Sequence, residues 1–186
     1  METLILVVLA CFTSALAQVP GFGGCPDAKP LAHLDLNRYL GKWYELYKMP
    51  NLFEGGQTCV TANYSVKANG HIKVYNHGFT NGEAVWAEGD AFLPDTTKPS
   101  QLTVKFTDNS PYAPYWVLDT DYDNYSAVFS CESLGGLAHV EFAWILSRNN
   151  TISDSLKQKI FKIFEKNGVG TTDIKKTVQD NCGKDV

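Results

Sequence analysis

Apolar and polar residues alternate along most of the chain, and turn-forming residues interrupt the alternation about every ten residues. A period of two is typical of strands with one buried face. The alternating segments are residues 43–48, 60–66, 71–77, 85–93, 101–106, 115–119, 125–131 and 140–147. Asn69-Gly70 and Asn81-Gly82 predict hairpin turns, because both residue types accept a positive φ. Eight hairpin-linked strands predict an all-β, up-and-down antiparallel β-barrel, since closure removes the exposed sheet edges.

One C-terminal segment has a helical period instead. Its apolar residues recur at i, i+4, i+7 and i+8, as Leu156, Ile160, Ile163 and Phe164. Thr151 and Asp154 have capping-box spacing before this stripe, and Gly168 is placed to end the helix. We therefore expect one α-helix packed against the outside of the barrel, with a short final strand within residues 172–178.

The first residues have the pattern of a secretory signal peptide. An apolar run from Leu4 to Phe12 precedes Ala15 and Ala17, which form an Ala-x-Ala cleavage pattern. The sequence predicts a signal peptide at residues 1–17, a mature single domain at residues 18–186, and a secreted, extracellular protein. A buried N-terminal strand is the alternative interpretation of the run. No other apolar run approaches the roughly 20 residues of a membrane-spanning helix.

The charge is mildly acidic and evenly scattered. Loss of residues 1–17 removes Glu2 alone among the charged side chains and changes the net charge from −4 to −3. Nucleic-acid binding needs a basic stripe that neutralises phosphates, and the sequence contains none. We therefore expect no nucleic-acid partner.

Four cysteines remain in the mature chain once Cys11 leaves with the signal peptide: Cys25, Cys59, Cys131 and Cys182. An even number in a secreted chain predicts two disulfides, with three connectivities open. Asn63, Asn124 and Asn149 each begin an Asn-x-Ser/Thr sequence, so we expect N-glycosylation at these three positions.

The predicted inner face of the barrel combines small and aromatic residues. Ala87, Gly89 and Ala91 share one face of their strand, and large side chains face them from other strands. An eight-stranded barrel either fills its interior or holds one small ligand. We predict an apolar cavity; a tapered, packed core is the alternative. The predicted lining residues are Tyr64, Asn76, Phe106, Tyr115, Phe129 and Trp144, with Tyr47 and Phe53 near the mouth and residues 51–57 as a lid.

Three short motifs occur in order along the chain: Gly41-Lys42-Trp43 in the first strand, Thr120-Asp121-Tyr122 in a later turn, and Arg148 after the last strand. Their order and separation resemble those of the lipocalin family. The resemblance implies that these residues are structural, with Arg148 packed on Trp43 at the closed end of the barrel. It also implies the disulfides Cys25–Cys131 and Cys59–Cys182.

The lipocalin resemblance implies a carrier or scavenger that binds a small hydrophobic ligand inside the barrel, such as a fatty acid, a steroid or a retinoid. Other segments resemble pigment-binding lipocalins, so a bilin or a carotenoid is the alternative ligand. No cofactor is required by either interpretation. We expect a monomer or a weak homo-oligomer, and the sequence identifies no receptor.

An enzyme is not expected. Some lipocalins use a free barrel cysteine as nucleophile, but the two implied disulfides would leave no thiol in the mature chain. Motifs of serine hydrolases, zinc proteases and phosphate loops are missing from the sequence. No metal site is expected either, because His71 and His77 are interpreted as surface residues of one strand.

Overall fold

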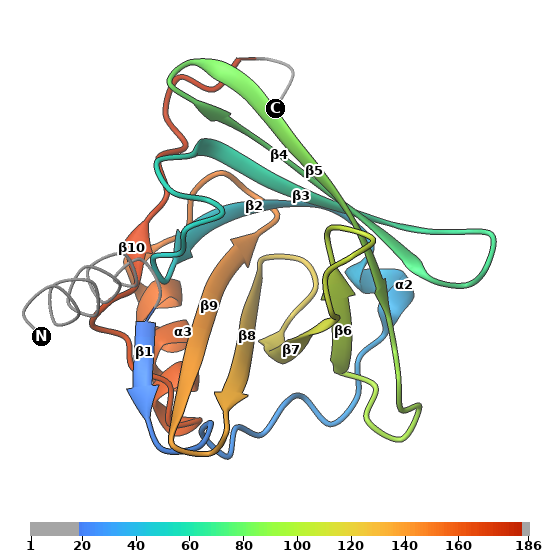
Figure 1. Cartoon of the computed structure of the whole chain (residues 1–186). Helices are drawn as coiled ribbons and strands as arrows, with labels where there is room; N and C mark the ends of the chain where they lie inside the picture. The colour runs from blue at the N-terminus through green and yellow to red at the C-terminus, as the bar shows by residue number, and fades with distance from the viewer. Residues whose placement is uncertain (1–18, 184–186) are drawn as a thin grey trace, which may run out of the picture.

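The computed structural model describes residues 19–183 of the chain (Figure 1). The strands are β1 (Val19–Phe22), β2 (Gly41–Lys48), β3 (Thr58–Val66), β4 (Ile72–Thr80), β5 (Glu83–Phe92), β6 (Gln101–Lys105), β7 (Ala113–Thr120), β8 (Tyr125–Leu134), β9 (Ala138–Ser147) and β10 (Lys175–Lys176), and the helices are α2 (Leu36–Tyr39) and α3 (Asp154–Lys166). The predicted signal peptide lies outside the described residues. Between residues 19 and 183 no helix is long and apolar enough to cross a membrane.

Strands β2 to β9 form the predicted barrel. Each strand pairs antiparallel with the next one along the chain, and β9 pairs with β2 to close the sheet. The turn between β4 and β5 has positive φ at both Asn81 and Gly82, the geometry that matches the twist of a tight hairpin. The eight-stranded up-and-down barrel is therefore confirmed.

Two short strands extend this barrel at its seam. β10 lies within the predicted final strand and pairs with β2, whereas β1 pairs with β9 and was not expected. The seam strands β2 and β9 thus have an additional neighbour on parts of their edges. These edges would otherwise expose unpaired N–H and C=O groups.

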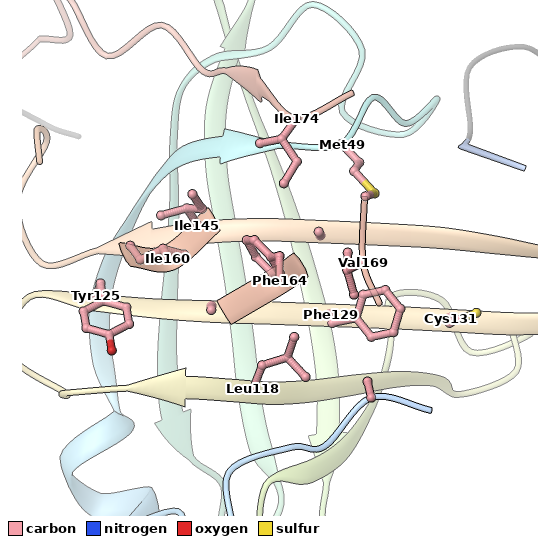
Figure 2. Close-up of a cluster of buried hydrophobic side chains, with 13 residues drawn as sticks. Met49, Leu118, Tyr125, Phe129, Cys131, Ile145, Ile160, Phe164, Val169 and Ile174 are labelled. Atoms are coloured by element: carbon pink, nitrogen blue, oxygen red, sulfur yellow. The ribbon is translucent and has the colours of Figure 1, made fainter. Parts of the chain in front are cut away.

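Helix α3 covers the outer face of the barrel, as expected. Ile160 and Phe164 are fully buried against a cluster that includes Phe129 and Ile145 (Figure 2). The N-cap is Ser153, whose side chain accepts a hydrogen bond from the Leu156 N–H, so the predicted cap at Thr151 is wrong. Ser153 is two residues closer to the first helical turn and still precedes an acidic residue there.

The short helix α2 was not predicted. Its N-cap Asp35 accepts a hydrogen bond from the Arg38 N–H, and its last residue, Tyr39, is buried. A helix of one turn has too few residues to show a 3.6-residue period. Its position matters because the chain passes from α2 directly into β2 at the closed end of the barrel (Figure 1).

Both implied disulfides are present. Cys25–Cys131 joins the N-terminal segment to β8, and Cys59–Cys182 joins the C-terminal segment to β3. The four cysteines among residues 19–183 are thereby all paired. The three predicted glycosylation sites, Asn63, Asn124 and Asn149, are exposed, and their modification stays a prediction.

Candidate functional site

One end of the barrel is closed by Arg148. Its guanidinium lies 3.7 Å from the centre of the Trp43 ring. The guanidinium N–H groups also donate to main-chain carbonyls at 2.7–3.0 Å, those of Arg38, Leu40, Lys42 and Tyr122. The Trp43 indole N–H donates to the Tyr39 carbonyl at 2.8 Å. Because the N–H groups of Arg148 and Trp43 donate to carbonyls of the protein itself, this arrangement closes the barrel and leaves few donors for a ligand.

The turn at residues 120–125 belongs to the same closed end. The Asp121 carboxylate accepts from the main-chain N–H groups of Asp123, Asn124 and Tyr125 and from the Asn124 side chain. Burial acts to raise the pKa of Asp121, but these hydrogen bonds outweigh it and lower the pKa. Tyr122 has a φ of 70°, and its hydroxyl accepts from the Asp35 N–H. The motif thus holds a strained turn beside α2.

Gly41 opens β2 at this end with a φ of 89°, in the left-handed region that favours glycine. A Cβ there would lie 3.6 Å from a terminal nitrogen of Arg148. Glycine lets the backbone turn sharply into β2 next to the Arg148 guanidinium, so the role of Gly41 is structural.

Above the closed end, the barrel interior is apolar and nearly filled. Its remaining space is about 10 Å³, enough for about one water molecule. The lining residues are Leu36, Tyr39, Tyr64, Ile72, Val74, Ala91, Leu102, Val104 and Tyr115. The tapered, packed core therefore describes this lower part of the barrel.

Four hydroxyl groups form a chain across the lower interior. Tyr64 contacts Tyr115 at 2.8 Å, Tyr115 contacts Tyr39 at 2.9 Å, and Tyr39 contacts Ser126 at 3.0 Å. Burial raises the pKa of Tyr39 to about 12, so these phenols are neutral donors. Four hydroxyls supply four hydrogens for three bonds, which leaves one O–H for another acceptor.

Asn76 introduces a polar group higher in the interior. It pairs with Ala62 on β3 and Ala87 on β5, and it shares a strand face with the interior residue Val74. Its side-chain oxygen is buried and accepts no hydrogen bond among the described residues. A buried acceptor without a donor costs about 1–3 kcal/mol, so an external donor would be bound favourably here.

Aromatic rings line the interior near the open end. The rings of Phe142 and Trp144 on β9 are stacked with centroids 5.9 Å apart, and Phe53 lies 5.6 Å from Phe142. On the opposite wall, a Cβ on Gly89 would approach the Phe106 ring to 2.9 Å. Glycine at this position therefore makes room for Phe106, which is 39% exposed. The structure thus brings Tyr64, Asn76, Phe106, Tyr115 and Trp144 around one interior, with Phe53 at its mouth.

Two predicted lining residues lie outside the barrel, and these predictions are wrong. Phe129 belongs to the core beneath α3 (Figure 2). Strand β8 is buried on both faces from Tyr125 to Cys131, so the alternation of polarity does not mark its inner face. Tyr47 packs edge-on against Phe161 of α3, because the register of β2 shifts between Glu45 and Tyr47 and reverses the alternation.

A buried polar cluster at the mouth was not predicted. The Lys48 ammonium lies 3.0 Å from a carboxylate oxygen of Glu45 and 3.3 Å from one of Glu54. The same Glu54 oxygen accepts from the Asn51 amide at 2.8 Å and from the Trp144 indole N–H at 3.2 Å. Burial first, and then the Glu54 charge, raise the pKa of Glu45 to about 7.

The sequence did contain one signal for this cluster. Glu45 follows Trp43 at a spacing of two, which places a carboxylate on the inner face of β2. A buried carboxylate requires partners, and Lys42 and Lys48, each three residues away, are the nearest cations in the chain. No comparable pattern indicated Glu54, because it lies in a loop, where side chains do not alternate as they do along a strand.

Comparison with known proteins agrees with this geometry. The family model described as "Lipocalin-like domain" matches residues 34–179. The chain is a lipocalin. It is 40% identical over 184 residues to apolipoprotein D of Cavia porcellus, across 96% of this chain and 97% of that protein. It is also 34% identical over 166 residues to the Lazarillo protein of Schistocerca americana, across 85% of this chain and 74% of that protein.

Solved lipocalin structures have the same architecture. Insecticyanin of the tobacco hornworm Manduca sexta superposes with a TM-score of 0.76 at 27% identity, covering 90% of this chain and 91% of that one. Lobster apocrustacyanin A1 superposes with a TM-score of 0.74 at 26% identity, covering 87% of this chain and 92% of that one. The barrel and its outer helix are therefore shared family features, consistent with a family that binds small hydrophobic ligands.

Proposed function

We propose that this lipocalin is a secreted carrier or scavenger that holds one small hydrophobic molecule, such as a fatty acid, a steroid or a retinoid, in the upper part of its barrel. The observation that carries the proposal is the unpartnered oxygen of Asn76, which is buried opposite an aromatic wall. Apolar walls with a few polar groups are typical of ligand sites. The similarity to apolipoprotein D supports a lipid-like ligand.

Burial of apolar surface is sufficient for useful affinity. About 400 Å² of buried apolar surface corresponds to roughly 10 kcal/mol, and a micromolar Kd requires about 8 kcal/mol. The Asn76 oxygen then influences orientation, because it can accept a hydrogen bond from a ligand hydroxyl. Oxygenated apolar molecules therefore fit better than pure hydrocarbons.

Tryptophan emission provides the test. Oleate, retinol, progesterone and biliverdin are titrated separately into the wild-type protein and into the variants Trp144→Phe and Trp86→Phe. We expect saturable quenching by at least one ligand, retained in Trp86→Phe and largely lost in Trp144→Phe. Trp86 is 68% exposed on the outside of β5 and serves as the matched control. An absence of saturable quenching with all four ligands would contradict the carrier function.

A bilin or carotenoid is the second candidate ligand. The stacked rings of Phe142 and Trp144, with Phe53 beside them, offer a flat aromatic surface for a conjugated molecule. The structural likeness to insecticyanin and crustacyanin supports this candidate. Protein isolated from its natural source would then have a visible absorption band, whereas a colourless protein with a co-purified lipid would favour the first candidate.

We further propose that the protein acts by binding and without covalent catalysis, as a monomer or a weak homo-oligomer, after cleavage behind Ala17. The cysteines between residues 19 and 183 are all in disulfides, which supports an extracellular site of action and leaves no thiol nucleophile there. N-terminal sequencing of the secreted protein checks the cleavage, and intact mass before and after glycosidase checks Asn63, Asn124 and Asn149.

A further inference from the structure

The barrel wall between β2 and β3 is a continuous ladder only near the closed end. β2 pairs with β3 from Gly41 to Tyr44 and no further. Tyr47 and Lys48 pair with β9 on one edge and with β10 on the other. Towards the open end, therefore, β2 and β3 diverge and leave a slot between them.

The C-terminal segment lies in this slot and follows the edge of β2 from Glu45 to Lys48. The Thr177 N–H donates to the Leu46 carbonyl on β2, and the Val178 carbonyl accepts from the Cys59 N–H on β3. The Gln179 amide donates at 2.8 Å to one carbonyl on each strand, those of Glu45 and Val60. Side chains and single hydrogen bonds replace a regular ladder here, so this part of the wall depends on a segment that is not a barrel strand.

Between this segment and the loop at residues 50–58 lies a cleft of about 480 Å³, which is within the range of ligand-sized pockets. Its lining comes from the end of β2, the loop at residues 50–58 and the C-terminal segment: Lys48, Pro50, Asn51, Glu54, Gly55, Gly56, Gln57, Thr58, Lys175, Lys176, Thr177 and Val178. A cleft at a gap in the wall is placed to communicate with the interior.

A thin polar partition separates this cleft from the aromatic part of the interior. Lys48 pairs directly with Trp144 across the seam between β2 and β9. Glu54 lines the cleft, and its carboxylate also accepts from the Trp144 indole and the Lys48 ammonium. Glu54 therefore contacts the cleft and an interior wall residue at the same time.

The loop that carries Glu54 gains little from apolar burial. Leu52 and Phe53 on this loop are 61% and 56% exposed. The loop is attached to the barrel by the polar contacts of Glu54 with Lys48 and Trp144 and by the contact of the Phe53 ring with Phe142. A loop with few buried apolar contacts opens at low cost, and here Glu54 is the group that resists opening.

We propose that this cleft, between the C-terminal segment and the loop at residues 50–58, is a lateral entrance to the barrel interior, and that Glu54 latches it closed. When the loop lifts, the Glu54 carboxylate leaves Lys48 and Trp144, and the cleft joins the aromatic interior. An apolar ligand then reaches Trp144 from the side. This inference rests on the proposed function, because an entrance requires a ligand inside the barrel.

A bulky label in the cleft tests the entrance. Gly55 lines the cleft, and a Cβ there meets only ordinary contacts at 3.6 Å, so Gly55→Cys should fold and accept a bulky maleimide. The control is Asn109→Cys with the same label, at an exposed position in the turn between β6 and β7. Association and dissociation of parinaric acid, a fluorescent fatty acid, are measured by stopped flow at constant pH.

We expect the label at position 55 to slow association and dissociation by the same factor of about ten or more, with Kd unchanged, while the label at position 109 changes neither rate. Glu54→Gln should speed both rates by about tenfold, as expected for weakening a charge-assisted hydrogen bond. Glu83→Gln, an exposed carboxylate at the open end, is its control and should leave both rates unchanged.

Three results would overturn the entrance. Unchanged rates with the label at position 55 would show that ligand enters elsewhere. A weakened Kd with that label would show that parinaric acid binds in the cleft itself. No binding of parinaric acid to the wild-type protein would contradict an entrance for fatty acids, whereas the proposed function is contradicted only if all four ligands fail in the tryptophan titration.

Discussion

The closed and open ends of the barrel satisfy their polar groups in different ways. At the closed end, Arg148 donates to several carbonyls and packs on a fully buried Trp43. Towards the open end, Asn76 keeps a buried acceptor unpaired, and Leu52 and Phe53 are largely exposed. The difference indicates that the closed end contributes stability, whereas the open end keeps an unsatisfied acceptor, the Asn76 oxygen.

The largest expected effect is on the tryptophan at the closed end. Trp43→Ala should lower the free energy of unfolding by about 3–5 kcal/mol, because it leaves a large cavity in a packed core. Trp86→Ala, at a residue 68% exposed, should change it by less than about 0.5 kcal/mol. Urea unfolding with intact disulfides measures both, and equal losses would contradict the assignment of stability to the closed end.

The chain contains two arginines, which provide a matched pair for the next prediction. Arg148→Met should cost about 2–3 kcal/mol, since it removes several charge-assisted hydrogen bonds and the contact with Trp43. Arg38→Met should cost less than about 1 kcal/mol, because Arg38 forms a half-exposed ion pair with Asp123. Comparable losses in urea unfolding would show that Arg148 is no more than a surface cation.

Stability should also depend on pH through Glu45. Its pKa is about 7 in the folded protein and 4.5 as the ordinary value. Between these values the folded state binds more protons than the unfolded state, so stability falls as the pH rises, by up to about 1.4 kcal/mol per unit. This contribution is fully present below pH 4.5 and is lost as the pH passes 7.

Glu45→Gln should remove this part of the pH dependence and stabilise the protein most above pH 7. Glu88→Gln is the control, since Glu88 is a half-exposed carboxylate paired with Lys73. Unfolding free energies of both variants and the wild type between pH 4.5 and pH 8 provide the measurement. An identical pH dependence in Glu45→Gln and the wild type would contradict the raised pKa.

The smallest expected effect on stability is a gain from replacing Asn76. Asn76→Leu should stabilise the ligand-free protein by about 1 kcal/mol, because it removes a buried acceptor without a donor. The same change should weaken binding of a hydroxylated ligand such as retinol by about fivefold to tenfold. Thermal unfolding and a retinol titration test the pair of effects, with Asn109→Leu as an exposed control; a loss of stability would show that Asn76 serves the fold.

The sequence predicted the features that depend on repeated or local patterns. Alternation gave the eight strands, and the motifs around Trp43, Asp121 and Arg148 indicated the closed end correctly. Asn76 and Trp144 were placed on the inner face because their strands β4 and β9 keep a regular register. Both placements follow from the alternation of side chains along a strand, which puts every second residue on the same face.

The failures have physical causes that one sequence does not reveal. Phe129 was misplaced because α3 buries the outer face of β8, so both faces of this strand are buried. Tyr47 was misplaced because a single register shift in β2 reversed its side. Glu54 was missed because its role depends on loop closure onto Lys48, a contact that no periodic pattern encodes.

Obstruction of the upper interior tests the central claim most directly. Ala87 and Ala84 are both exposed alanines on β5, but Ala87 pairs with Asn76 on the inner face, and alternation places Ala84 on the outer face. Titration of retinol or oleate into Ala87→Trp and Ala84→Trp should show binding lost in the first variant and retained in the second. Wild-type affinity in Ala87→Trp would contradict a ligand site inside this barrel.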